Sequence, residues 1–157
     1  MDHSGTRILA ADRWTVWRHL VSAQSLAHCI PGCESVAGTA DTGFEMVVRR
    51  KVGPFQLHFA GTIELVDVVP ARRVTLVGRG KGGLAGLAEG DARIRLADHE
   101  AGTLLAWDLG ALLEGLVARL GRKPLDAAVA TMTGRFLDRL EELLPGGVAG
   151  GGGGPSA

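Results

Sequence analysis

The chain has 157 residues, 46% of them hydrophobic, and its 17 basic residues balance its 17 acidic residues. This length suits one domain with one core, and the net charge of zero argues against a sequence-independent nucleic-acid binder, which needs a concentrated positive surface. Because the chain has no apolar run of about 18 residues and no secretory signal at its N-terminus, we expect a cytoplasmic protein without a membrane span.

Two short helices are expected near the N-terminus. Asp12 can cap a helix over residues 13–21, because its carboxylate accepts hydrogen bonds from the free amides of the first turn. A second turn over residues 25–30 is ended by Pro31 and Gly32. We expect the segment Ile30-Pro31-Gly32 to form a structural gate at the mouth of a pocket, an idea that depends on a positive φ at Gly32.

From residue 34 onward the apolar residues alternate with polar ones, which is the pattern of half-buried antiparallel strands. Polar clusters at residues 40–43 and 98–102 separate the runs as turns. The residues predicted to form the apolar strand faces are Phe44, Met46, Val48, Phe55, Leu57, Phe59, Gly61, Ile63, Leu65, Val74, Leu76, Gly78, Ala92, Ile94, Leu96, Leu105, Trp107, Leu109, Ala111 and Leu113.

One long helix is expected to end the domain, which we place at residues 1–145. Pro124 suits its first position, because the missing amide would be unpaired there anyway. Its apolar residues recur at spacings of three and four; they are Leu125, Ala128, Val129, Met132, Phe136, Leu140 and Leu143. Residues 146–157 are predicted to be a flexible tail, because a glycine run buries too little surface to offset its ordering entropy.

The glycine-rich residues 78–86 do not predict a phosphate-binding loop. Such a loop needs a strand before it, a helix after it and an acidic residue about 20 positions on, whereas antiparallel strands are expected on both sides. Hairpin turns and bends of a curved sheet explain these glycines better.

No catalytic or metal-binding residue is predicted. The histidines and carboxylates show no pairing on one face that would suit a metal, a nucleophile or a general acid and base. Cys29 and Cys33 are interpreted as small buried thiols, because only His28 is near them in sequence and a disulfide is not expected in a reducing compartment.

Several motifs, in their order along residues 6–142, resemble the CoxG-like family of carbon monoxide dehydrogenase proteins, a branch of the START-like (SRPBCC) helix-grip superfamily. The motifs are Ile30-Pro31-Gly32-Cys33-Glu34, Lys51-Val52-Gly53-Pro54, Phe59-Ala60-Gly61-Thr62-Ile63, Gly86-Leu87-Ala88-Glu89-Gly90-Asp91-Ala92 and Gly102-Thr103-Leu104. The resemblance implies an α+β helix-grip fold, in which a curved antiparallel sheet of about seven strands wraps around a long C-terminal helix, with two short helices after the first strand.

The resemblance also implies a function. Such proteins are non-catalytic accessory factors of molybdenum hydroxylases such as aerobic carbon monoxide dehydrogenase, so we expect membrane recruitment of the enzyme or delivery of an electron acceptor. The expected ligand is a hydrophobic small molecule, a quinone or a lipid, with no covalent cofactor, and any membrane contact is peripheral. Two alternatives stay open, a maturation or docking factor with a filled core and a polyketide cyclase-like enzyme.

The position of the ligand rests on small residues in the last helix. They either leave a cavity or let the helix pack close to the sheet, and the resemblance favours the cavity. The predicted ligand-binding residues are Trp17, Phe59, Leu76, Leu84, Leu87, Ile94, Trp107, Leu109, Ala128, Met132 and Phe136. Of these, Leu84 and Leu87 are expected to make a shallow membrane contact that depends weakly on salt, because the net charge is zero.

Overall fold

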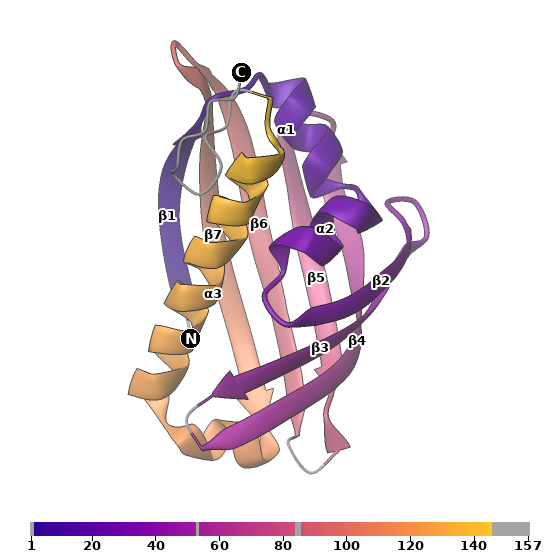
Figure 1. Ribbon diagram of the computed structural model, residues 1–157, viewed down its shortest axis with the longest axis vertical. Helices are drawn as coiled ribbons and strands as arrows, with labels where there is room; N and C mark the ends of the chain where they lie inside the picture. Colours follow the sequence, from indigo (N-terminus) through magenta and orange to yellow (C-terminus); the bar gives the residue numbers. More distant parts are fainter. Residues whose placement is uncertain (1, 53, 84–85, 146–157) are drawn as a thin grey trace.

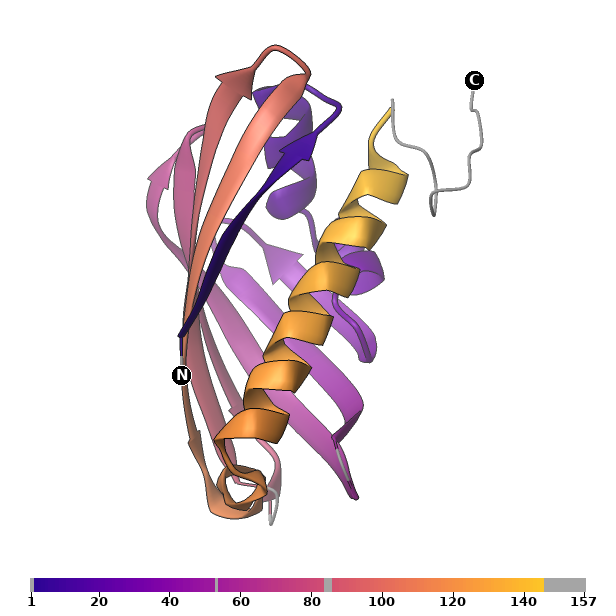
Figure 2. The same ribbon diagram turned by 90° about the vertical axis from the view of Figure 1, so that its left-hand side faces the viewer.

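The computed structural model describes residues 2–52, 54–83 and 86–145. A seven-stranded antiparallel sheet in the order β1-β7-β6-β5-β4-β3-β2 curves around one long helix (Figures 1 and 2). Its strands are β1 (Asp2–Leu9), β2 (Cys33–Thr39), β3 (Gly43–Val52), β4 (Phe55–Val69), β5 (Arg73–Lys81), β6 (Leu87–His99) and β7 (Gly102–Glu114). The helices are α1 (Arg13–Leu20), α2 (Ala23–Cys29), the 3₁₀ helix η2 (Gly115–Leu120) and α3 (Arg122–Leu143). The predicted helix-grip fold is therefore confirmed, while the predicted tail lies outside the described residues.

The antiparallel order gives the molecule two ends. The β4–β5 and β6–β7 turns lie at the end that carries α1, which we call the α1 end (Figure 1). The last residues of β3 and β5 and the first residues of β4 and β6 lie at the opposite end with η2 and the start of α3, and we call this the η2 end (Figures 1 and 2). In the described part of the chain, no helix combines the length and apolar character needed to cross a membrane.

The predicted start of α1 is confirmed. The Asp12 carboxylate accepts hydrogen bonds from the amides of Trp14, at 3.1 Å, and Thr15, at 3.3 Å. A further hydrogen bond from the Thr15 hydroxyl, followed by these amides, lowers the pKa of Asp12. The second helix starts two residues earlier than predicted, at Ala23, because the Ser22 hydroxyl caps it by accepting from the Ser25 amide.

The long helix also starts earlier than predicted, at Arg122. Its first backbone bond runs from the Leu125 amide to the Gly121 carbonyl. Pro124 therefore lies in the first turn, where a missing amide leaves no hydrogen bond unmade. The reason for a proline in the first turn is therefore confirmed, but Pro124 is the third residue of the helix rather than the first.

Gly32 has a φ of 79°, which is the condition on which the proposed gate depends. The Gly32 carbonyl accepts a hydrogen bond of 2.8 Å from the Arg49 amide, and a β-carbon on Gly32 would overlap the Arg49 carbonyl oxygen. Pro31 beside it is fully buried. This turn therefore locks α2 to β3 through backbone contact that only glycine permits.

The core gathers at the α1 end, between the sheet, α1 and the second half of α3. Its most buried members are Leu9, Val16, Leu20, Val74, Leu96, Leu105, Leu137, Leu140 and Leu144. Leu137 and Leu144 lie in this core although the predicted helix face did not include them, whereas Phe136 is only half-buried. The side of α3 that carries the buried apolar residues therefore shifts around the helix axis between the first and the second half of the helix.

Candidate functional site

The inner face of the sheet changes character toward the η2 end, where small residues replace large ones. On one rung Gly78 pairs with Gly90, and Gly90 pairs with Ala111. On the next rung Gly80 pairs with Ala88. All of these positions are half-buried rather than buried. The central strands therefore present a floor with almost no side-chain volume on the concave side of the sheet.

Helix α3 crosses over the concave side of the sheet, above this floor. Its backbone comes closest to α2 and to β1 and β3, which lie at the two margins of the sheet, rather than to β5 and β6 in the middle. Figure 2 shows α3 running obliquely across the concave side. The helix residues Ala128 and Met132 are half-buried. We call the small-residue floor together with these two helix residues the inner hollow.

Two aromatic rings border the inner hollow, and each lies over glycine. Phe59 covers Gly80 and Gly82, where an added β-carbon would lie 3.5 Å from the Phe59 Cβ and 2.8 Å from its Cε1 respectively. On the other side the Trp107 ring lies over Gly5 of β1, where an added β-carbon would overlap the indole. Glycine at these positions makes room for flat rings against the sheet.

The Trp107 indole nitrogen is the buried side-chain polar atom, in the part of the chain that the structure describes, that has no hydrogen-bond partner. The His3 ring lies beside the Trp107 ring, with ring centroids 6.2 Å apart. An unpaired buried donor costs about 1–3 kcal/mol, so an acceptor atom brought to this nitrogen by a ligand would remove an existing penalty. Neither His3 nor this unpaired donor was singled out from the sequence.

The structure brings most of the predicted ligand-binding residues around the inner hollow. Half-buried positions around it are taken by Phe59, Leu76, Trp107, Leu109, Ala128, Met132 and Phe136. Leu76, Trp107 and Phe136 also pack against the core cluster and so form the boundary between core and hollow.

Four predicted residues lie elsewhere. Trp17 and Ile94 are members of the core at the α1 end, with exposed fractions of 8% and 7%. Leu87 pairs with Lys81 and Glu114, so it lies on the outer face of the sheet, opposite to Ala88. Leu84 lies outside the described residues.

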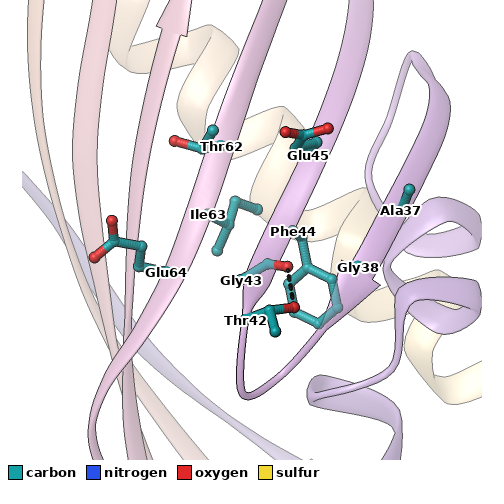
Figure 3. A pocket seen from close by; sticks show the side chains of 9 residues that line it. All are labelled: Ala37, Gly38, Thr42, Gly43, Phe44, Glu45, Thr62, Ile63 and Glu64. Carbon is teal, nitrogen blue, oxygen red and sulfur yellow. Dashed lines mark hydrogen bonds between the residues drawn. The ribbon is translucent and has the colours of Figure 1, made fainter.

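A pocket of about 350 Å³ lies on another part of the surface, around the β2–β3 hairpin (Figure 3). Its lining includes Glu45 and Thr62, which are cross-strand partners, and Glu64. Figure 3 shows the two carboxylates apart, on either side of Ile63, rather than directed at one point. None of the predicted ligand-binding residues lines this pocket.

The two thiols differ in their surroundings. Burial raises the pKa of Cys29 to about 12, so this thiol is protonated at neutral pH and unreactive. Cys33 is half-buried, and burial raises its pKa as well. The prediction of buried thiols therefore holds fully for Cys29 and only in part for Cys33. Within the described residues, no group of three or more histidine, cysteine or acidic side chains could hold a metal ion.

Solved structures share this fold. A conserved protein from Geobacillus kaustophilus superposes with a TM-score of 0.82 at 22% sequence identity, covering 89% of this chain and 92% of its own. A protein from Chromobacterium violaceum gives a TM-score of 0.68 at 17% identity, covering 91% and 96%. A protein from Rhodobacter sphaeroides gives 0.61 at 20% identity, covering 88% and 89%. At sequence identities below 25%, these similarities show a shared fold and nothing about function.

Sequence comparison adds the family. No curated protein matches the chain significantly. The family model for the carbon monoxide dehydrogenase protein CoxG, however, matches residues 5–144, which include the whole sheet from Gly5 onward, η2 and α3. The chain therefore belongs to the CoxG family of carbon monoxide dehydrogenase proteins.

Proposed function

We propose that this protein is a non-catalytic accessory factor of a molybdenum hydroxylase such as aerobic carbon monoxide dehydrogenase, and that it carries a hydrophobic small molecule in the inner hollow. Membership of the CoxG family supports the accessory role. The observation that carries ligand binding is the half-buried floor of small residues beneath an α3 that stays nearest the sheet margins. A quinone or a lipid is the class of ligand that suits such a surface.

The lining of the inner hollow defines the chemistry of the ligand. Leu76, Leu109 and Met132 supply apolar contacts, and each Å² of apolar surface that a ligand removes from water contributes about 25 cal/mol. The Phe59 and Trp107 rings stand on opposite sides of the glycine floor, which suits a flat or extended molecule. The free donor on Trp107 suits a ligand with one carbonyl or similar oxygen.

The two alternative functions predict different contents of the inner hollow. A docking factor with a filled core would hold no ligand, and its half-buried inner residues would close on one another when the protein is free of partners. A polyketide cyclase-like enzyme would need polar groups directed at a substrate. Among the described residues, the lining combines apolar side chains with the unpaired donor of Trp107, which favours binding over catalysis.

Native mass spectrometry of the purified full chain tests this proposal, together with organic extraction of the same sample. We expect a bound hydrophobic molecule in substoichiometric or full amount. After extraction, a short-chain ubiquinone should rebind and quench tryptophan fluorescence, because Trp107 borders the hollow. A chain that carries nothing and does not respond to quinones, lipids or aromatic ketones would favour the docking factor with a filled core.

A further inference from the structure

Two aromatic side chains, His3 and Trp107, meet at the margin of the inner hollow, and we call them the aromatic pair. His3 lies on β1, at the edge of the sheet, and Trp107 lies on the neighbouring strand β7. A β-carbon added at Gly5 would overlap the indole, so Gly5 faces the Trp107 ring. His3 is two residues from Gly5 along β1 and therefore shares this concave face, with its ring centroid 6.2 Å from that of Trp107.

Both rings of the aromatic pair carry polar atoms without a partner. The Trp107 indole nitrogen is buried and unpaired. The His3 imidazole is half-buried and has no hydrogen bond or ion pair with another of the described residues. An indole N–H can only donate, whereas a neutral imidazole offers one donor and one acceptor. The aromatic pair can therefore present a donor and an acceptor to one polar group of a ligand.

The charge on the same face of β1 is already neutralised. Arg7, two residues after Gly5, is held by Asp138 at 2.8 Å and by Glu141 at 3.1 Å, both on α3. An anionic group brought to this margin would meet two carboxylates and a cation that they already occupy. A neutral polar group therefore suits the aromatic pair better than an anion does.

We propose that the aromatic pair binds a phenolic hydroxyl, so that the ligand of the inner hollow is a phenol or a hydroquinone rather than an aryl ketone. This inference rests on the proposed function, because it names the group by which the hydrophobic molecule is recognised. The Trp107 N–H donates to the hydroxyl oxygen, and the hydroxyl donates to the bare nitrogen of His3. A hydroxyl that leaves water needs such replacement partners. A carbonyl oxygen has no proton to offer and would leave the acceptor nitrogen of His3 unused.

The register of the strands sets the direction of the rest of the ligand. Trp107 packs against the core cluster, so the aromatic pair lies where the core ends. Beyond it on β7 come Leu109, which pairs with Ala92, and Ala111, which pairs with Gly90. A ligand held by its hydroxyl at the aromatic pair therefore extends its apolar part over the small-residue floor toward the η2 end.

Two matched probes separate the hydroxyl from the rest of the ligand. 2-Naphthol and 2-methoxynaphthalene share the ring and the oxygen atom, but only 2-naphthol has a proton to donate. In titration calorimetry of the full chain after organic extraction, we expect 2-naphthol to bind about tenfold more tightly, which one added hydrogen bond can provide. His3→Phe should remove this preference and leave the affinity for 2-methoxynaphthalene unchanged. Equal affinities of the unchanged protein for the two probes would overturn the proposal.

Two further variants distinguish hydrogen bonding from ring shape. His3→Gln supplies an amide oxygen as acceptor and should keep most of the preference for 2-naphthol. A loss as complete as that in His3→Phe would mean that the imidazole acts by its shape, which contradicts the proposal. His58→Phe, at an exposed position of β4, is the matched control and should bind both probes as the unchanged protein does.

A third probe, 2-acetylnaphthalene, and NMR spectra complete the test. If His3→Phe weakens binding of this ketone as much as that of 2-naphthol, His3 donates to a carbonyl and the hydroxyl proposal is wrong. 2-Naphthol should move the NMR signals of the His3 imidazole much further than 2-methoxynaphthalene does. Binding of the probes without any preference contradicts this inference and leaves the proposed function standing. Absence of binding by all naphthalene probes, quinones and lipids contradicts the proposed function, and the inference then fails with it.

Discussion

The two ends of the same concave face are built from different residues. At the α1 end, large side chains such as Leu105 and Leu140 close the space between sheet and helix and are almost fully buried. At the η2 end the same strands carry glycine and alanine, and every such position is half-buried. One sheet and one helix therefore combine a tightly packed core with a region of small, half-buried residues, and residue size along the strands decides where one changes into the other.

Truncation of a leucine at each end should show the largest difference. Leu105→Ala removes a side chain that is 2% exposed and should lower the free energy of unfolding by about 2–5 kcal/mol, because it leaves a cavity in the core. Leu109→Ala, four residues further along β7, should lower it by less than about 2 kcal/mol, because Leu109 is half-buried. Urea unfolding of both variants measures this. Equal losses would mean that the η2 end is packed as tightly as the α1 end.

Gly32→Val should have the next largest effect, a loss of about 1–3 kcal/mol, because a β-branched residue is strained at a φ of 79°. Contact with the Arg49 carbonyl adds to this loss. Gly83→Ala is the control: its φ of 58° is also positive, but an added β-carbon meets nothing within 4 Å. Thermal unfolding of both variants separates backbone strain from overlap. If both lose the same stability, the close approach to Arg49 does not contribute.

Much of the fold could be predicted because local chemistry determines it. The alternation of apolar and polar residues predicted the strands, and the Asp12 carboxylate predicted the start of a helix. The Pro31-Gly32 turn likewise has the positive φ that glycine permits. The side of the sheet on which Leu87 lies could also have been predicted from the sequence. Extending the alternation back from Ala92 through Gly90 and Ala88 puts Leu87 on the outer face, where the structure has it.

Other features depend on contacts between distant parts of the chain. The unpaired nitrogen of Trp107 becomes apparent only when its neighbours, including His3 and Gly5, are placed around it. The basic residues Lys51, Lys81 and Arg122 are likewise far apart in sequence and come to the η2 end of the molecule through the order of the strands. Net charge cannot reveal this arrangement, because acidic residues elsewhere in the chain cancel in the same sum.

Trp107→Phe tests the free donor of the inner hollow. The substitution keeps an aromatic ring and removes the N–H, so it should weaken binding of 2-acetylnaphthalene about tenfold, which corresponds to about 1.4 kcal/mol. Binding of 2-ethylnaphthalene, which has no carbonyl, should change far less. Trp14→Phe is the control, since Trp14 is 51% exposed on α1. Titration calorimetry gives the affinities, and the indole N–H signals in NMR spectra give a second readout. A ketone that moves no Trp107 signal would rule out this hydrogen bond.

The smallest effect on stability is expected when a small residue of the floor is replaced by a larger one. A small effect would show that the region beneath α3 has space for the added side chain. Ala92 is half-buried between Leu76 and Leu109 on neighbouring strands. In a filled core, Ala92→Leu would overpack and cost about 1–3 kcal/mol. In an open hollow the added side chain has space, so we expect a change within about 0.5 kcal/mol together with weaker binding of both naphthalene probes. Ala97→Leu, exposed on the same strand, should change neither quantity. Strong destabilisation by Ala92→Leu alone would mean that side chains already fill the space beneath α3.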